Sequence, residues 1–393
     1  MRRPLHRPPI PYHYLSQCSP DDEDSPNVQS HRVFITSIHW NNEKILRSSW
    51  NAAVISLVQY FGPSNVYISI YESGSWDDTK GALRQLDEEL ATLNVPRSVI
   101  LDETTHAQIL EKGPDAEGWI DTKAGKKELR RIPYLSRLRN LALQPLTDLD
   151  KENSTRFDKT LFLNDVAFTT ADVASLLATR DGDYAAACSL DFAKPPYYYD
   201  TFALRDTQGH EAASSTFPFF RSRASRKAIL AHEPIPVRSC WNGIVAFDAA
   251  PFYSTHSSQE NEQTSTPGLR FRGISDALSM KHLEGSECCL VHVDNPLSST
   301  RGVWVNPNVR VGYSLEAYEA MHPKDGQWPG SWGTIAGAWR NRVMRWATSP
   351  RIKEGVVRRR VDAHGKESGE KEKGEVCLIN EMQVLRGNGW AHV

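Results

Sequence analysis

Hydrophobic and polar positions follow two periods along the first hundred residues. The apolar, β-branched runs Val33–Ile38 and Val66–Tyr71 are typical of buried strands, and Val99–Leu101 predicts a third, shorter one. Between them, apolar residues recur at helical spacing over Asn41–Tyr60 and from Asp77 or Asp78 to Leu93. This β-α-β-α-β order predicts an α/β domain with a mostly parallel central sheet flanked by helices.

The same periods continue through the middle of the chain. We expect a helix at Tyr134–Ala142, a strand at Thr160–Val166, a helix at Val173–Leu177 that Asp172 caps, and a strand at Tyr184–Cys188. The segment 191–253 is rich in aromatic residues, Pro and Gly and shows little periodicity. That composition is typical of long, ordered loops that bind substrate.

Composition sets the boundaries and excludes several classes of protein. Residues 1–31 are Pro-rich and then acidic, which predicts a disordered lead-in or stalk remnant. Residues 347–393 are basic and then rich in Lys, Glu and Gly, which predicts a partly disordered tail and leaves one large domain at 32–346. Lys and Arg (46) nearly balance Asp and Glu (48), so the charge excess of a general nucleic-acid binder is missing. The longest apolar stretch, 52–61, is too short to span a bilayer.

The first candidate for chemistry is an acid at the end of a strand. Asp165 follows the apolar run Thr160–Leu163, and ligands of open α/β sheets bind at the carboxyl ends of strands. A carboxylate there can hold a divalent cation that neutralises phosphates, or it can simply begin a turn. Arg137 and Arg139 lie on the preceding helix but on different faces, so one of them can meet a phosphate while the other stays in solvent. The alternative is an ordinary solvated helix face.

Further candidates combine acids with aromatic rings or with a histidine. Asp191 and Asp200 adjoin Phe and Tyr residues, a combination that suits sugar rings but equally forms ordinary core. An apolar run predicts a strand at Cys289–Val293, with Glu287 just before it and His292 near its end, where an imidazole can ligate Mn²⁺ or be structural. Cys288 and Cys289 form no C-x-x-C pair, so we expect buried structural roles for both thiols.

Six blocks, in order along the chain, carry a resemblance to a known family. They read VFITSIHWNNE at 33–43, SIYESGSWD at 69–77, LNDV at 163–166, CWNG at 240–243, SECCL at 286–290 and NPNVRV at 306–311. Over roughly residues 32–315 the chain resembles the fungal cryptococcal α-1,3-mannosyltransferase and capsule-associated protein family, the family 69 glycosyltransferases.

The resemblance implies a fold and an activity. The fold is a GT-A-type nucleotide-sugar fold with long C-terminal acceptor loops. The activity is a retaining transfer of mannose from GDP-mannose to an α-mannoside or other glycan acceptor, forming an α-1,3 bond with the help of Mn²⁺ or Mg²⁺. Retention requires either a front-face displacement or a nucleophilic carboxylate, and the sequence leaves both open.

The resemblance also assigns roles to residues. Asp165 becomes the metal ligand, and because Asn164-Asp165-Val166 offers one carboxylate where the usual motif has two, we expect His292 to complete the set. The expected catalytic residues are Asp191, Asp200 and Glu287. Trp241 and Asn242 are expected to bind the acceptor. The residues expected to bind the donor are Ser37, His39, Asn41, Glu72, Asp77, Arg137, Arg139 and Asn164.

Alternatives remain at this point. The chain can be a family member with another donor or acceptor, or a non-catalytic glycan-binding or assembly protein on the same fold. Nucleic-acid binding has little support, and the oligomeric state is not fixed. The resemblance implies the Golgi lumen or membrane, but no anchor or signal is present in this chain, so a soluble intracellular protein is the alternative.

Overall fold

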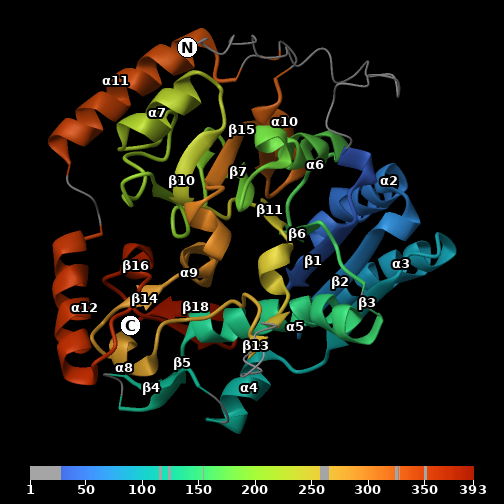
Figure 1. Ribbon diagram of the computed structural model, residues 1–393, viewed down its shortest axis with the longest axis horizontal. Helices are drawn as coiled ribbons and strands as arrows, with labels where there is room; N and C mark the ends of the chain where they lie inside the picture. Colours follow the sequence, from blue (N-terminus) through green and yellow to red (C-terminus); the bar gives the residue numbers. More distant parts are fainter. Residues whose placement is uncertain are drawn as a thin grey trace.

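A ten-stranded mixed sheet runs through the molecule. The computed structural model describes residues 28–114, 117–122, 125–153, 155–256, 265–323, 326, 328–348 and 352–393. The sheet has the order β3-β2-β1-β6-β11-β7-β15-β10-β9, with β8 paired to β7 (Figure 1). Its strands are β1 Val33–His39, β2 Val66–Ser73, β3 Arg97–Asp102, β6 Lys159–Leu163, β7 Ala186–Lys194, β8 Tyr197–Tyr198, β9 Arg205–Asp206, β10 Ile235–Ser239, β11 Ile244–Asp248 and β15 Val303–Gly312.

Strand direction divides the sheet into two parts. β3, β2, β1 and β6 are parallel, as the β-α-β-α-β pattern predicts. β11 lies antiparallel between β6 and β7, and β7 and β15 are parallel to each other. The short paired strands outside this sheet are β4 Trp119–Asp121, β5 Lys127–Leu129, β12 Thr255–His256, β13 Ser265–Thr266, β14 Glu284–Gly285, β16 Leu378–Ile379, β17 Gln383–Arg386 and β18 Gly389–His392.

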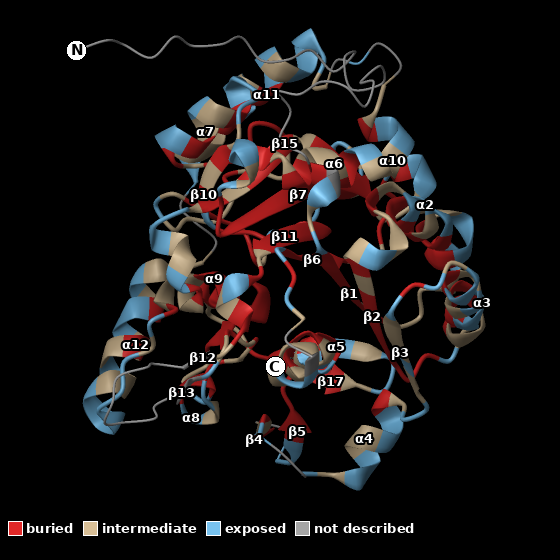
Figure 2. Ribbon diagram, turned by 45° about the vertical axis from the view of Figure 1, so that its right-hand side comes forward, coloured by how far each residue is buried: buried red, intermediate tan, exposed pale blue. Residues whose placement is uncertain are grey.

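Alternate residues of each strand face two different helical layers. Val33 and Ile35 of β1 enter one core with Leu161 of β6, whereas Phe34 and Phe162 enter the other. The first core is covered by α2 Asn51–Phe61, α3 Thr79–Thr92 and α6 Thr170–Leu177, and the second by α5 Arg131–Asn153, α7 Arg223–Leu230 and α9 Glu287–Asp294 (Figures 1 and 2). The predicted α/β architecture, a central sheet flanked by helices, is confirmed.

Local signals account for most of the helix boundaries. The helix expected over Asn41–Tyr60 forms as α1 Glu43–Ile45, a π-helical segment Leu46–Trp50, and α2. The cap of α6 differs from the prediction: Thr169 is the N-cap, and Asp172 is the third helical residue, whose carboxylate accepts a hydrogen bond from the Thr169 backbone. The remaining helices are α4 His106–Lys112, α8 Asp276–Ser279, α10 Leu315–Met321, α11 Ser331–Ala347 and α12 Glu354–Ser368.

The strand expected at Cys289–Val293 is wrong, because these residues form α9. Four apolar or sulfur-containing residues in a row, 288–291, do not distinguish a buried strand from a buried helix. All residues of α9 from Glu287 to His292 are buried. The helix therefore has no exposed polar face, and the sequence shows no helical period of polar and apolar positions.

The C-terminal segment also differs from the expected tail. Val357 and Val361 of α12 pack against Leu283 and Leu290, and β16 pairs with β14. Leu385 of β17 packs beside α5. Residues 352–393 therefore form part of the folded domain rather than a solvated extension of it. The lead-in expected at 1–31 lies almost entirely outside the described residues.

Two disulfides join distant parts of the chain. Cys188 on β7 is bonded to Cys240, and Cys289 on α9 is bonded to Cys377, 88 residues further on. Cys288 is buried and free among the described cysteines. The expectation of buried structural roles holds for both residues, and Cys289 fills its role as a disulfide link to the C-terminal segment. None of the helices in the described ranges is both long and apolar enough to cross a bilayer.

We predict that the double variant Cys289→Ser/Cys377→Ser loosens the C-terminal segment. Loss of a native disulfide that closes a long loop costs about 2–5 kcal/mol of unfolding free energy. Urea unfolding should show this loss, and limited proteolysis should cut first after residue 352. The matched control, Cys188→Ser/Cys240→Ser, should lose stability without this selective cleavage. Equal cleavage patterns in both variants would contradict the prediction.

Candidate active site at the carboxyl edge of the sheet

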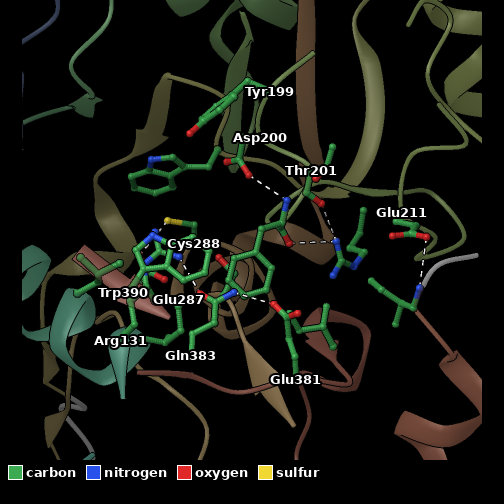
Figure 3. A pocket seen from close by; sticks show the side chains of 18 of the residues that line it. Arg131, Tyr199, Asp200, Thr201, Glu211, Glu287, Cys288, Glu381, Gln383 and Trp390 are labelled. Carbon is green, nitrogen blue, oxygen red and sulfur yellow. Dashed lines mark hydrogen bonds between the residues drawn. The ribbon is translucent and has the colours of Figure 1, made fainter. Parts of the chain in front are cut away.

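A cavity of about 650 Å³ opens where the central strands end (Figure 3). Its wall combines α5, the loop after β8, the first turn of α9 and the C-terminal hairpin β17–β18. The structure thus brings together segments that lie far apart in the chain, such as Arg131 and Gln383, which are 252 residues apart and whose side chains lie 2.7 Å from each other. Five of the predicted site residues line this cavity: Arg139, Asn164, Asp200, Trp241 and Glu287.

A left-handed turn between β10 and β11 organises one wall. Asn242 has φ 57° and Gly243 has φ 88°, a backbone conformation that Asn and Gly tolerate best. A Cβ at position 243 would lie 2.5 Å from the Val311 side chain, so only Gly fits. The turn directs the Asn242 amide to Asp191 Oδ1 (3.4 Å) and to the Asp200 carbonyl (3.3 Å). Asn242 therefore ties β7 to the loop that carries Asp200.

The buried Asp191 and the half-buried Asp200 form an acidic pair. Asp191 Oδ1 accepts the Asp200 backbone N–H at 3.2 Å, and Oδ2 accepts the Tyr313 hydroxyl at 3.1 Å. Burial, reinforced by the charge of Asp200, raises the pKa of Asp191 to about 7, and burial also raises the pKa of Asp200. Near neutral pH this pair therefore holds a proton readily, or would be stabilised by a nearby cation.

The end of β6 carries a second polar group. The Asn164 carbonyl accepts the Trp50 indole N–H at 2.9 Å, and Asn164 Oδ1 accepts the Trp241 indole N–H at 3.1 Å. The next residue, Asp165, accepts the Asn42 side-chain amide at 2.9 Å through Oδ2. Burial raises the pKa of Asp165 to about 6. Asp165 is thus a carboxylate with one neutral hydrogen-bond donor and a raised proton affinity.

Three carboxylates converge on two tyrosines at this edge. Burial raises the pKa of Tyr199 and Tyr313, and the charges of Asp165, Asp191 and Asp200 add to the effect on both rings. Both tyrosines line the cavity, and their ring centroids are 4.7 Å apart. The charges of the three acids therefore reach one neighbourhood, where oxygen ligands and negative charge suit a hard divalent cation. In the described part of the chain the three carboxylates do not all lie within 4.8 Å of one another, so they do not by themselves form a complete set of ligands for such an ion.

Arg139 supplies positive charge to the cavity wall. Its Nε donates to Glu287 Oε1 at 3.1 Å, and its guanidinium lies 4.3 Å from the centre of the Trp241 ring. Arg137 lies on another face of α5, as the spacing predicts, and lines a separate cavity on the other side of the helix. Of the two arginines, Arg139 is the one that reaches this site.

Ser37 and His39 lie at the end of β1 but outside the cavity lining. The Ser37 hydroxyl donates to the Leu163 carbonyl at 2.6 Å and lies 2.8 Å from His39 Nε2. His39 Nδ1 lies 3.2 Å from Asn42 Oδ1, and burial lowers the pKa of His39 to about 4. A neutral His39 therefore fixes Asn42, whose amide in turn holds Asp165.

The remaining candidates for the donor side also make hydrogen bonds within the protein. Asn41 Oδ1 accepts the Trp76 N–H at 3.0 Å, linking the ends of β1 and β2. Glu72 is fully buried and pairs with Lys80 at 3.2 Å, while Asp77 accepts the Glu43 N–H at 3.1 Å. These contacts shape the loops after β1 and β2, and the residues do not line the described cavity.

His292 lies apart from Asp165. Its Nε2 is 2.6 Å from the Cys240 carbonyl, and its ring stacks on Phe247 with centroids 5.2 Å apart. Phe247 pairs with Thr160 near the start of β6, roughly 13 Å along the strand from Asn164. Burial lowers the pKa of His292 to about 4. His292 is therefore not a partner of Asp165 for one metal ion; it is a neutral core histidine beside the Cys188–Cys240 disulfide.

Several lining residues were not predicted from the sequence. Tyr199, Tyr313 and Arg131 line the cavity, as do Gln383 and Trp390 of the C-terminal hairpin (Figure 3). A signal for the hairpin existed, because an Asn-Gly pair between two short alternating runs predicts a tight turn. The contribution of Arg131 depends on how α5 is oriented, which local periodicity does not define.

Comparison with known proteins places the chain among glycosyltransferases. The family model described as Cryptococcal mannosyltransferase 1 matches residues 32–294. Alpha-1,3-mannosyltransferase CMT1 of Cryptococcus neoformans var. neoformans serotype D is 26% identical over 321 residues, which are 76% of this chain and 62% of that protein. The chain thus spans about three-fifths of the length of this relative.

Solved structures give only distant likenesses. Mannosyltransferase PcManGT from Pyrobaculum calidifontis, in complex with GDP-Man and Mn²⁺, is 11% identical, with 91% of this chain and 81% of that chain covered and a TM-score of 0.39. GalNAc-T7 with UDP, GalNAc and Mn²⁺ is 14% identical, with 79% and 48% covered and a TM-score of 0.38. Similarity at this level supports no inference about ligands.

We predict that Asp191→Asn flattens the dependence of stability on pH. Because the pKa of Asp191 rises from 3.8 to about 7 on folding, the folded state binds the proton more tightly, and stability falls as pH rises between these values. The full difference corresponds to roughly 4 kcal/mol. Urea unfolding from pH 4 to 8 should show a smaller decline in the variant than in the wild type. An unchanged decline would contradict the prediction; Asp183→Asn, an exposed acid paired with Arg301, is the control.

Proposed function

Because the chain belongs to the Cryptococcal mannosyltransferase 1 family, we propose that it is a glycosyltransferase that transfers mannose from GDP-mannose to an α-mannoside or related glycan. The observation that carries this proposal is the Asp191–Asp200 pair at a cavity that Asp200, Arg139 and Asn164 line, with Asp165 the residue after Asn164. The mixed α/β sheet, with Asp165 just beyond the end of β6, supports the GT-A-type fold implied by the resemblance.

Asp165 is the residue we assign to a divalent metal, Mn²⁺ or Mg²⁺. The ion would supply positive charge to the donor diphosphate, as metal ions do in phosphoryl and glycosyl chemistry. Asn42 holds one carboxylate oxygen of Asp165 in place, and Trp50 and Trp241 fix the neighbouring Asn164. This chain therefore fixes the position of its ligand before any donor binds.

Arg139 is the cation we place near the leaving diphosphate. Its contacts with Glu287 and Trp241 restrict the guanidinium to one orientation, which suits recognition of phosphate oxygens. Arg137, on the opposite side of α5, is outside this proposal. Ser37, His39, Asn41, Glu72 and Asp77 act as supports that shape the loops below the donor.

The acids divide into contact and positioning roles. Asp200 and Glu287 line the cavity and are the candidates to contact the reacting sugar, as a nucleophile or as a stabiliser of the oxocarbenium-like transition state. Asp191 is fully buried and acts through the Asp200 backbone as a positioning residue. Trp241 and Asn242 are both buried, and the Arg139 guanidinium covers the Trp241 ring, so we assign these two residues to shaping the acceptor side rather than to stacking on a sugar.

The two disulfides support an oxidising compartment. Structural disulfides form and persist in secretory organelles and are rare in reducing ones. We therefore propose that the protein works in a secretory compartment, with the Golgi lumen implied by the family resemblance.

The direct test is transfer by purified Asp165→Asn protein. With GDP-mannose, Mn²⁺ and α-1,3- or α-1,6-linked mannobiose, we expect product from the wild type and a loss of at least about a hundredfold in the variant. Asp183→Asn is the matched control and should remain active. Full activity of Asp165→Asn would contradict the metal assignment. If the wild-type protein transfers sugar from another nucleotide sugar instead, the proposed donor is wrong. If it binds mannosides without any transfer, the proposal that it is a catalyst is wrong.

We predict that Arg139→Lys and Arg137→Lys behave differently, although the two positions share a helix and both variants keep the charge. Lysine cannot reproduce the planar contacts of Arg139 with Glu287 and the Trp241 ring, so KM for GDP-mannose should rise about tenfold or more. Arg137→Lys should stay within about twofold of the wild type. Steady-state kinetics measure KM in both variants, and thermal unfolding checks that both are folded. If KM changes equally in the two variants, Arg139 does not bind the donor.

A further inference from the structure

Helix α11 lies at the surface with many exposed positions (Figure 2), and these positions include a row of large apolar residues. Trp332, Trp339 and Trp346 are 83%, 63% and 88% exposed, and Ile335 and Val343 are about half exposed. Their spacing of three or four residues places all five on one face of the helix. We call these five residues the α11 stripe. None of them belongs to the described hydrophobic clusters, and contiguous exposure of this kind marks an interaction site.

The opposite face of α11 anchors it to the domain. Gly337 packs so closely that a Cβ would lie 2.3 Å from the Phe217 carbonyl oxygen. Asn341 is buried and donates to the Phe220 carbonyl at 3.3 Å, and it also accepts the Arg345 Nε–H at 2.9 Å. At 100° per residue, Gly337 and Asn341 lie roughly opposite the middle of the stripe. The stripe therefore faces away from the protein.

Positive charge borders the stripe on both sides. With 100° of rotation per residue along α11, the exposed Arg340 and Arg342 fall on opposite edges of the stripe. The Arg342 guanidinium lies 5.6 Å from the centre of the Trp339 ring. The chain has no Asp or Glu between residues 326 and 353. The row of Trp, Ile and Val thus lies between cations, with no acid of its own helix to pair with them.

The neighbouring helix α7 extends this positive surface. α7 and α11 lie side by side (Figures 1 and 2), and Arg221, just before α7, donates to the Thr348 carbonyl at 3.3 Å. Residues 212–232 likewise contain no Asp or Glu and carry Arg221, Arg223, Arg226 and Lys227. Burial and then the charge of Arg345 lower the pKa of Arg226, which indicates that the cations of the two helices are close together.

We propose that the α11 stripe docks on an anionic membrane surface, with its indole rings at the level of the headgroups and the arginines of α11 and α7 against lipid phosphates. Trp is enriched at membrane interfaces, and an apolar face bordered by Arg and Lys is typical of helices that lie in the interface plane. Each cation near an anionic leaflet adds attraction, whereas two copies of this face would bring like charges together. This charge pattern favours a lipid surface over a second copy of the chain.

The experiment is sedimentation of the full-length protein with vesicles of phosphatidylcholine alone or with 30% phosphatidylserine. We expect wild-type protein to bind the anionic vesicles at least tenfold more tightly than the neutral ones. Trp332→Ser/Trp339→Ser/Trp346→Ser should lower binding at least tenfold. Arg340→Glu/Arg342→Glu should remove most of the preference for phosphatidylserine. The matched control, Ile100→Ser/Leu141→Ser/Met280→Ser, removes three exposed apolar side chains elsewhere and should bind within twofold of wild type.

Three results would overturn the proposal. They are wild-type protein that stays in the supernatant with both vesicles, a triple Trp variant that binds like wild type, or a wild-type dimer that the Trp changes make monomeric without any vesicle binding. Thermal unfolding checks each variant. Trp346→Ser alone, at the most exposed position, gives the same test with a smaller change and should lower binding several-fold.

Discussion

The hydrogen bonds of Asn242 hold the candidate site together. Its left-handed turn is possible because Gly243 follows, and the close approach of Gly243 to β15 leaves no room for a Cβ. From this turn the amide reaches both Asp191 and the Asp200 carbonyl, so two strands and a loop are fixed at one point. The Cys188–Cys240 disulfide joins β7 to the same turn two residues earlier. The Asp200 N–H also donates to Asp191, so the turn and β7 together define the position of Asp200 in the cavity.

The same burial that fixes these acids makes their negative charge unfavourable. The pKa values of Asp165 and Asp191 are raised to about 6 and about 7, so each carboxylate gains from a proton or a cation nearby. Arg139, a cation of the same cavity wall, is already paired with Glu287. A divalent ion that arrives with a diphosphate would neutralise both the acids and the phosphates. This electrostatic demand links the buried acids to the proposed chemistry.

The sequence predicted those parts of the structure that depend on local periodicity. The strands β1, β2, β3 and β6 and their helices follow from runs of apolar residues, and the position of Asp165 at a strand end follows with them. The antiparallel insertion of β11 between β6 and β7 could not be predicted, because pairing of distant strands depends on the whole sheet. The misassigned α9 shows the same limit, since a wholly buried segment carries no period.

Asp165 was singled out because it follows a strand, and Asp191 and Asp200 because they adjoin aromatic residues; the structure brings Asp191 and Asp200 together, while the roles of all three stay predictions. His292 was misplaced because a helix was taken for a strand, which set it at the wrong end of the sheet. Arg139 could be separated from Arg137 only after the cavity was seen on one side of α5. The C-terminal hairpin had a turn signal, but its place in the cavity wall depends on Cys377, whose partner the spacing of the cysteines does not reveal.

The most direct measurement of the central claim is binding of Mn²⁺ in the presence of GDP, followed by the electron paramagnetic resonance signal of the free ion. If the buried acids and the cavity form a nucleotide-sugar site, wild-type protein with GDP should remove one equivalent of Mn²⁺ from solution beyond what GDP alone removes. If protein and GDP together remove no more Mn²⁺ than GDP alone, the carboxylates do not hold a catalytic ion and the account is contradicted.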